Sequence, residues 1–380
     1  MAACGTGRIE PAPTPDLCKA ADCSWQRLGA LLDSAVSAGA APGGVVAVSH
    51  RGRHFLHATG RLALDDPARP DGRTLYDLAS LTKVVATTTL TMLAVNDGRL
   101  ELDRPAAAYV PVFRGPGKEA VTVRHLLTHS SGLPADRPLW RQASDARAAL
   151  ALVTGSRLDT VPGTRMVYSD LGAIVLGLAV ERALGGRLDR LARTRIFVPL
   201  GMRNTRFRPP ASLHHRVAAT EYDTAWRKRI VRGEVHDEKA AFLGGVAGHA
   251  GLFGSAQDLL AFGEWMLDAV GRSDALGATA REFTRRQGLV PGSSRALGWD
   301  TPSPGSSAGT RLHRSSFGHT GFTGTSIWID PTRDLVVVLL TNRVHPTRAN
   351  TRQVPLRIAV ADLAASLADS GSPVDPRDRR

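Results

Sequence analysis

The stretch TSIWIDPTRDLVVVLL at residues 325–340 contains two apolar, β-branched runs separated by the turn-forming residues 330–334. Such runs on either side of a short segment with Asp and Pro are typical of a β-hairpin. Residues 45–50 and 54–59 show a similar pattern around Arg51-Gly52. We therefore expect strands near both ends of the chain.

Helical patterns fill the region between these strands. The apolar spacing predicts helices over residues 24–41, 79–95, 124–127, 145–153, 170–184 and 256–270, and a last helix over 353–367. Strands at both ends with helices between them favour an α+β fold. In this interpretation residues 24–78 and 308–370 form an α/β sheet domain, and residues 79–307 form a mostly helical domain. Residues 1–23 are expected to be a flexible N-terminal arm and residues 371–380 a disordered tail.

Composition excludes several classes of protein. The 380 residues are 43 % hydrophobic and 22 % charged, which is typical of a globular protein. The net charge of +13 is scattered and accompanies no nucleic-acid motif, so no nucleic-acid partner is expected. The longest apolar run, residues 171–180, is too short for stable membrane insertion. The three cysteines lie within residues 1–23 without metal-site spacing, so no disulfide framework is expected in the core.

The sequence leaves localisation and oligomeric state open. As it stands, the chain is expected to be cytoplasmic. Removal of a signal peptide would instead make it periplasmic or extracellular.

Lysine is scarce in this chain. Only five of the 48 basic residues are Lys, at positions 19, 83, 118, 228 and 239. Because the Arg guanidinium cannot lose its proton in proteins, Arg is a poor general base. Each Lys is therefore a candidate for chemistry.

One of these lysines follows a serine at helical spacing. In Ser80-Leu81-Thr82-Lys83 the hydroxyl and the amine share one face at the start of a helix. The positive end of the helix dipole would stabilise a Ser80 alkoxide and, together with burial, favour a neutral, proton-accepting Lys83. The alternative is an exposed helix start with an ordinary N-terminal Ser.

Two further segments carry candidate groups. Tyr168-Ser169-Asp170 precedes an apolar helix, where Tyr168 could shuttle a proton and Asp170 could anchor Lys83 or orient a substrate amide. The alternative there is an N-capping Asp beside a packed Tyr. His319-Thr320-Gly321 leads into a strand, and the N–H of Phe322 could form an oxyanion hole with the N–H of Ser80. An ordinary Gly-rich turn is the alternative there.

In this order the three segments resemble the serine β-lactamase and penicillin-binding protein superfamily, in particular its class C-like branch with family VIII esterases and D-stereospecific peptidases. Residues 126–134, 199–202 and 248–252 resemble further segments of that branch. The resemblance spans residues 24–370. It implies a β-lactamase/transpeptidase-like fold, with an antiparallel sheet flanked by helices beside a mostly helical region.

The resemblance also implies an acyl-enzyme on Ser80, with Lys83 and Tyr168 exchanging its proton. The implied substrate is a small ester, amide or peptide, with esterase, D-Ala-type peptidase and weak β-lactamase activity all possible. No cofactor and no metal are implied. An acyltransferase, or a catalytically silent penicillin-binding-like module, are the alternatives.

Two positions depart from the branch. Asp170 stands where Asn is frequent, and His319 stands where antibiotic-hydrolysing members usually carry a Lys that helps to hold the substrate carboxylate. We expect His319 to be mostly neutral at pH 7, which argues against efficient β-lactam hydrolysis. Arg343, after the last strand, is the predicted replacement for that positive charge.

Two other kinds of hydrolase are disfavoured. Gly305-Ser306-Ser307-Ala308-Gly309 matches a nucleophile-elbow pattern, but it lacks the strand and helix that an elbow requires. The run His236-Asp237-Glu238 lacks a helical metal-binding His pair, so these residues are expected to be surface or structural.

Overall fold

The computed structural model describes residues 24–370, so the predictions for residues 1–23 and 371–380 lie outside the described residues. Five strands form an antiparallel sheet in the order β2-β1-β8-β7-β6. Their bounds are β1 Gly43–His50, β2 Arg53–Gly60, β6 Phe317–Thr320, β7 Ser326–Asp330 and β8 Leu335–Thr341. The expected α+β class is therefore confirmed, with strands from both ends of the chain paired at the centre of the sheet.

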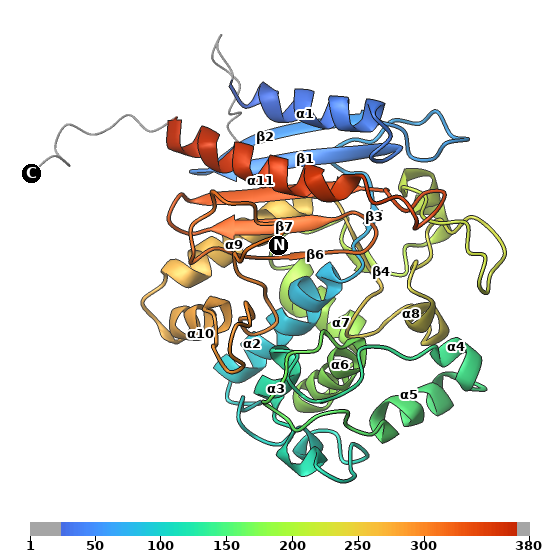
Figure 1. Cartoon of the computed structure of the whole chain (residues 1–380), viewed down its shortest axis with the longest axis vertical. Helices are drawn as coiled ribbons and strands as arrows, with labels where there is room; N and C mark the ends of the chain where they lie inside the picture. The colour runs from blue at the N-terminus through green and yellow to red at the C-terminus, as the bar shows by residue number, and fades with distance from the viewer. Residues whose placement is uncertain (1–23, 371–380) are drawn as a thin grey trace, which may run out of the picture.

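The side chains of strand β1 alternate between two hydrophobic cores, one on each face of the sheet. Val46 and Val48 pack with α1 (Gln26–Ser37) and α11 (Gln353–Ser370). Val45 and Ala47 point to the opposite face, where α9 (Ala256–Gly271) packs and the larger core begins. Successive residues of a strand point to opposite faces, so both faces of β1 are buried under helices. Figure 1 shows α1 and α11 beside the sheet, away from the helical part of the molecule.

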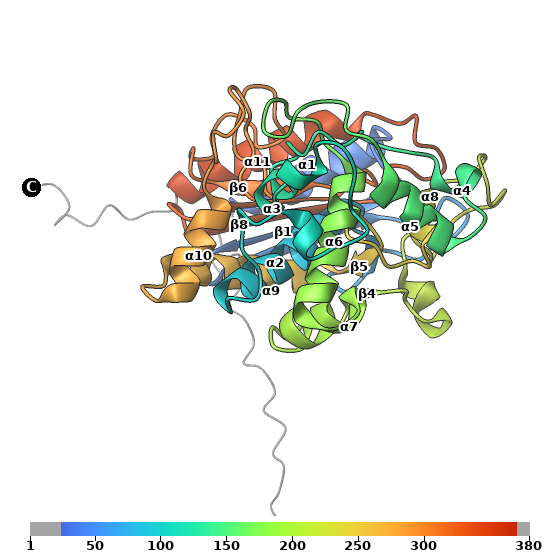
Figure 2. The same cartoon turned by 90° about the horizontal axis from the view of Figure 1, so that it is seen from below.

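The remaining helices form the other part of the molecule, which contains α6 (Asp170–Leu184), whose residues 171–177 are all buried. The others are α2 Thr89–Asn96, α3 Val123–Leu127, α4 Leu139–Gln142, α5 Ala146–Gly155, α7 Leu188–Ala192, α8 Glu238–Phe242 and α10 Ala275–Thr284, several of which Figure 2 shows from below. Of these, α2, α3, α5 and α7 pack against α6. Short 3₁₀ segments lie at Ala106–Ala108, Lys118–Ala120 and Ala211–Arg216, and π-helical segments at Lys83–Thr88 and Arg193–Phe197. Among residues 24–370, no helix combines the length and apolar composition that a bilayer span requires.

A second, small sheet ties the helical region to the main sheet. It has the order β3-β5-β4, with β3 Tyr76–Asp77, β4 Arg206–Phe207 and β5 Leu252–Gly254. The Leu78 N–H, directly after β3, donates to the Leu252 carbonyl at 2.9 Å. This sheet therefore fixes the chain immediately before Ser80.

Candidate active site

Ser80 lies directly after a tight turn at the start of the helical segment. Ala79 adopts a φ of 46°, a left-handed conformation that is uncommon for a residue with a side chain. The Asp77 carboxylate accepts from the Ala79 N–H at 2.8 Å, and the Asp77 carbonyl accepts from the Thr323 hydroxyl at 2.6 Å. These bonds hold the turn in its strained conformation and place Ser80 beside the end of β6.

Lys83 contacts Ser80 as the spacing predicts. Its amine lies 2.9 Å from the Ser80 hydroxyl, 3.1 Å from the His249 carbonyl and 2.8 Å from Asp170 Oδ1. The Lys83 side chain is only 5 % exposed. Of the two roles considered for Asp170, the structure shows the contact with Lys83.

The protonation state of Lys83 differs from the sequence-based expectation. Burial disfavours the ammonium, but the Asp170 carboxylate, helped by the neighbouring Tyr168, outweighs burial and raises the pKa of Lys83. The expected neutral amine is therefore wrong for the resting enzyme. The Asp170 carboxylate, in direct contact with the amine, outweighs the helix dipole and burial.

Tyr168 lies beside this pair and is held by a histidine. The Lys83 amine is 4.9 Å from the centre of the Tyr168 ring, and the Tyr168 hydroxyl is buried without a hydrogen-bond partner among the described residues. His129 stacks on the ring at 4.4 Å between centroids and accepts from the Ser169 N–H at 3.1 Å. Ser169, rather than Asp170, caps α6 by accepting from the Gly172 N–H.

The His319-Thr320-Gly321 segment ends strand β6 next to the nucleophile. A Cβ on Gly321 would lie 2.1 Å from Thr325 Oγ1 and 2.4 Å from the Leu78 carbonyl oxygen, so only Gly fits there. No hydrogen bond of the described residues uses the N–H of Ser80 or of Phe322 as donor. Both groups are therefore available for the oxyanion hole that the sequence suggested.

A cleft of about 690 Å³ opens over these groups. All of the predicted site residues except Lys83 line it, and Lys83 lies beneath its floor. Burial, reinforced by Arg295 and Lys83, lowers the pKa of His319 well below its usual value, so this side chain is neutral at pH 7. Its Nε2 atom is buried without a partner in residues 24–370.

The arginines of the cleft differ in how they are bound. Arg343, the predicted replacement charge, is 6 % exposed and donates to the carbonyls of Phe322, Arg348 and Asn350. Arg295 lies 5.2 Å from the Tyr168 ring centre, and its Nε and Nη1 are buried without a partner in the part of the chain that the structure describes. Arg295, a residue that the sequence did not single out, therefore lines the cleft and has two buried donors without a partner among the described residues.

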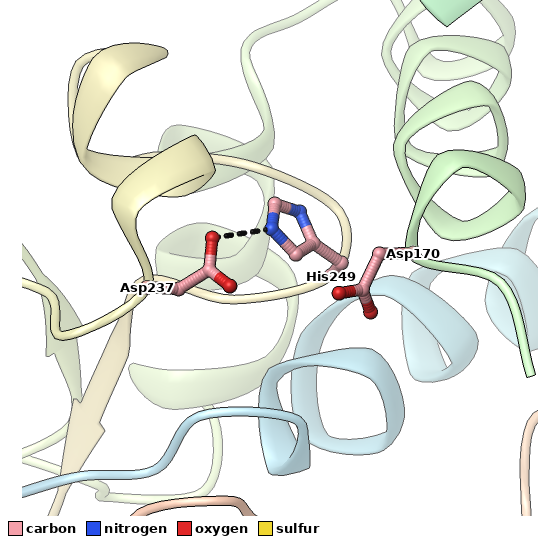
Figure 3. Close-up of side chains that lie close together, drawn as sticks. All are labelled: Asp170, Asp237 and His249. Carbon is pink, nitrogen blue, oxygen red and sulfur yellow. Dashed lines mark hydrogen bonds and ion pairs between the residues drawn. The ribbon is translucent and has the colours of Figure 1, made fainter. Parts of the chain in front are cut away.

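A buried ionic network continues behind Asp170. Lys239 contacts three carboxylates, at 2.9 Å from Asp136, 3.2 Å from Asp170 and 3.1 Å from Asp237. His249 Nε2 lies at hydrogen-bond distance, 2.9 Å, from Asp237. Figure 3 shows Asp170, Asp237 and His249 converging from three separate segments of the chain. Of these residues the sequence indicated only Asp170 as a site residue, although the scarcity of lysine is a signal that also marks Lys239.

The same convergence could be taken for a metal centre. The ligand atoms of Asp170, Asp237 and His249 lie within 4.8 Å of one another. However, the Lys239 ammonium already lies within 3.2 Å of both carboxylates, and Lys83 contacts the other oxygen of Asp170. A metal ion would have to displace or oppose these two cations, so the donor set does not fit one.

Ser307 and the run His236-Asp237-Glu238 line the cleft, and most of their polar groups are bound by neighbouring side chains. Ser307 lies in a turn without an adjoining strand or helix, and its hydroxyl accepts from the Trp328 indole at 3.3 Å. His236 Nε2 lies at hydrogen-bond distance, 2.9 Å, from Glu221. Glu238 forms an ion pair with Arg348, and Asp237 caps α8. This run is therefore buried or half-buried along the cleft rather than on the open surface, and its structural role stays a prediction.

Comparison with known proteins identifies the family of this chain. The family model described as Beta-lactamase matches residues 28–362. The chain belongs to the beta-lactamase family. This member is 32 % identical over 330 residues to a putative D-alanyl-D-alanine carboxypeptidase of Escherichia coli (strain K12), a match that covers 78 % of this chain and 75 % of the relative. A protein of Salmonella typhi with the same description is 31 % identical over 330 residues, covering 78 % of this chain and 76 % of the relative.

Solved structures show the same fold for this beta-lactamase family member. A class C beta-lactamase from Rhodobacter sphaeroides is 25 % identical with a TM-score of 0.69, covering 89 % of this chain and 100 % of that one. EstCE1, described as a hydrolase with promiscuous acyltransferase activity, is 23 % identical with a TM-score of 0.70, covering 88 % of this chain and 98 % of that one.

Proposed function

We propose that this protein is a serine hydrolase that cleaves an ester or amide bond close to a free carboxylate of its substrate, through an acyl-enzyme on Ser80. The proteins compared above are described as a putative D-alanyl-D-alanine carboxypeptidase, a class C beta-lactamase and a hydrolase with promiscuous acyltransferase activity, which supports hydrolysis of an ester or amide. The observation that carries the proposal is the contact of 2.9 Å between the Lys83 amine and the Ser80 hydroxyl at the floor of the cleft.

The proposed chemistry has two half-reactions. The Ser80 oxygen attacks the carbonyl carbon, and the N–H groups of Ser80 and Phe322 stabilise the oxyanion. The Ser80 proton passes to the Lys83–Tyr168 pair and then to the leaving amine or alcohol, whose bond to the carbonyl breaks. Water then adds to the acyl-enzyme, releases the acid and restores the Ser80 hydroxyl.

The raised pKa of Lys83 has a kinetic consequence. In the resting enzyme its ammonium donates to the Ser80 oxygen rather than accepting from it. The pair must lose a proton before it can accept the one from Ser80. Activity is therefore expected to rise with pH through neutrality, because the reactive form accumulates only as the pair deprotonates.

Arg295 supports a carboxylate-bearing substrate. Arg295 lines the cleft, and its buried Nε and Nη1 groups lack partners among residues 24–370. Arg donors match the planar geometry of a carboxylate, which would reach them as the side chain turns toward the cleft. The relatives described as D-alanyl-D-alanine carboxypeptidases suggest a peptide that ends in D-alanine as such a substrate. The neutral His319 supplies no competing positive charge.

The test compares substrates with and without a carboxylate. Wild type, Ser80→Ala, Arg295→Gln and Arg343→Ala are assayed with p-nitrophenyl acetate, a peptide ending in D-Ala-D-Ala and a chromogenic cephalosporin. We expect Ser80→Ala to abolish all turnover, and Arg295→Gln to raise KM for the peptide about 10- to 100-fold, with a smaller effect on the ester.

Two results would contradict the proposal. Turnover that survives Ser80→Ala would remove Ser80 from the reaction. A rise in peptide KM in Arg343→Ala but not in Arg295→Gln would assign the carboxylate to Arg343 instead.

A further inference from the structure

The Asp170 carboxylate lies between two buried ammonium groups. Its Oδ1 atom is 2.8 Å from Lys83, and its Oδ2 atom is 3.2 Å from Lys239. The side chains of Lys83 and Lys239 are 5 % and 6 % exposed. Solvent therefore screens little of the interaction among these three charges.

Lys239 does not need carboxylates simply because it is buried. Lys118 is also a buried lysine, and its amine is bound by the carbonyls of Thr154 at 2.6 Å and Arg114 at 3.3 Å, with the Phe113 ring centre at 4.8 Å. This fold thus accommodates a buried lysine with neutral partners. The convergence of three carboxylates on Lys239, one shared with Lys83, calls for another explanation.

We propose that Lys239 is a positioning residue that sets the proton affinity of Lys83 by sharing the Asp170 carboxylate with it. Lys239 holds one oxygen of Asp170 and leaves the other facing Lys83. Its positive charge also opposes that of Lys83 and offsets part of the attraction from Asp170. This inference rests on the proposed role of Lys83 in activating Ser80.

The other groups around Lys83 do not provide the same control. Tyr168 faces the amine from the segment before α6, and Arg295 lies against its ring. The nearby His129 and His319 are neutral because burial lowers the pKa of each, with Arg295 and Lys83 adding to the effect. His249 pairs with Asp237, and its ring also lies within 4.8 Å of Asp170, where, against the effect of burial, it joins Lys83 and Lys239 in lowering the pKa of that carboxyl. Among the described residues, Lys239 is the second lysine in an ion pair with the carboxylate that Lys83 contacts.

The test is the pH dependence of kcat/KM for p-nitrophenyl acetate, a substrate that does not titrate. Lys239→Met removes the opposing charge, so Lys83 should hold its proton more tightly and the acid limb of the kcat/KM profile should move up by about one to two pH units. At a fixed pH below that limb, the shift is measured as a kcat/KM that is about 10- to 100-fold lower than in wild type. Lys239→Arg keeps the charge and should stay close to wild type. Lys118→Met is the matched control for loss of a buried lysine, and it should lower stability without moving the limb.

The pH profiles of these variants either support or overturn the role proposed for Lys239. An acid limb that is unchanged or lower in Lys239→Met would overturn the inference, as would an equal upward shift in Lys118→Met. If Lys239→Met does not fold, Asp136→Asn tests the same inference. Asp136 contacts Lys239 but is 57 % exposed, so its substitution should leave the protein folded. Its removal should move the limb down by a few tenths of a unit, and an upward shift or none would overturn the inference. Turnover that survives Ser80→Ala would instead refute the proposed function.

Discussion

Adding one methyl group at Gly321 should separate the nucleophile turn from the strand beside it. The new Cβ would lie 2.4 Å from the Leu78 carbonyl oxygen, and an ordinary contact needs at least 3.4 Å, so the backbone must open by about 1 Å. Thr325 Oγ1, at 2.1 Å, adds a second clash. A displacement of about 1 Å between reacting groups costs on the order of 100-fold in rate. Overpacking of this kind costs about 1–3 kcal/mol of stability.

We therefore expect Gly321→Ala to lower kcat/KM for p-nitrophenyl acetate about 100-fold while the protein remains folded. Gly155→Ala is the control, since Gly155 is exposed at the end of α5 with nothing within 4 Å of a new Cβ. The double variant Gly321→Ala/Thr325→Ala removes only one of the two clashes and should recover part of the activity. Wild-type kcat/KM and thermal stability in Gly321→Ala would refute this reasoning.

Three further changes test other parts of the structure. Asp170→Asn removes the carboxylate that raises the pKa of Lys83, so the acid limb of the kcat/KM profile should move to lower pH by about one to three units. A shift of the limb to higher pH would contradict the charge state assigned to Lys83. Phe262→Ala removes a buried ring that stacks on Trp299 with 6.2 Å between centroids. The free energy of unfolding, measured by urea denaturation, should fall by about 3–5 kcal/mol, and an unchanged unfolding midpoint would count against the packing described. Dialysis against EDTA should leave ester turnover unchanged because Lys239 fills the space between the carboxylates, whereas a loss that zinc restores would argue for a metal.

Long elements with a clear residue pattern were predictable from the sequence. The helix over 170–184 has the predicted bounds, and residues 331–334, within the predicted turn, connect β7 and β8. The β3–β5–β4 sheet was missed because strands of two or three residues carry no periodicity. Residues 79–95 were predicted as one regular helix, but residues 83–88 are π-helical, and the Thr89 hydroxyl donates to the Val84 carbonyl at 2.8 Å. Side-chain bonds of this kind are not visible in an apolar pattern.

Local spacing also limits what the sequence indicates about the site. Ser80 and Lys83 were found together because three residues along a helix fix their distance. Asp237, Lys239 and His249 reach Asp170 from a loop and a short helix, and no spacing rule relates these segments to residue 170. The charge state of Lys83 depends on that distant contact. It was therefore mispredicted from the helix alone, although the position of Lys83 was predicted correctly.

The pairing of β1 with β8 has a consequence for how the protein acquires activity during synthesis. Gly43 donates to Asn342, a residue 299 positions later in the chain, and the Ser80 turn is held by Thr323. A growing polypeptide that has made Ser80 and Lys83 still lacks the strands that complete their surroundings. Contacts this distant in sequence form late and slow folding. The nascent chain should therefore stay inert until the segment with β6 to β8 has left the ribosome, and in the meantime it exposes an unpaired edge of β1.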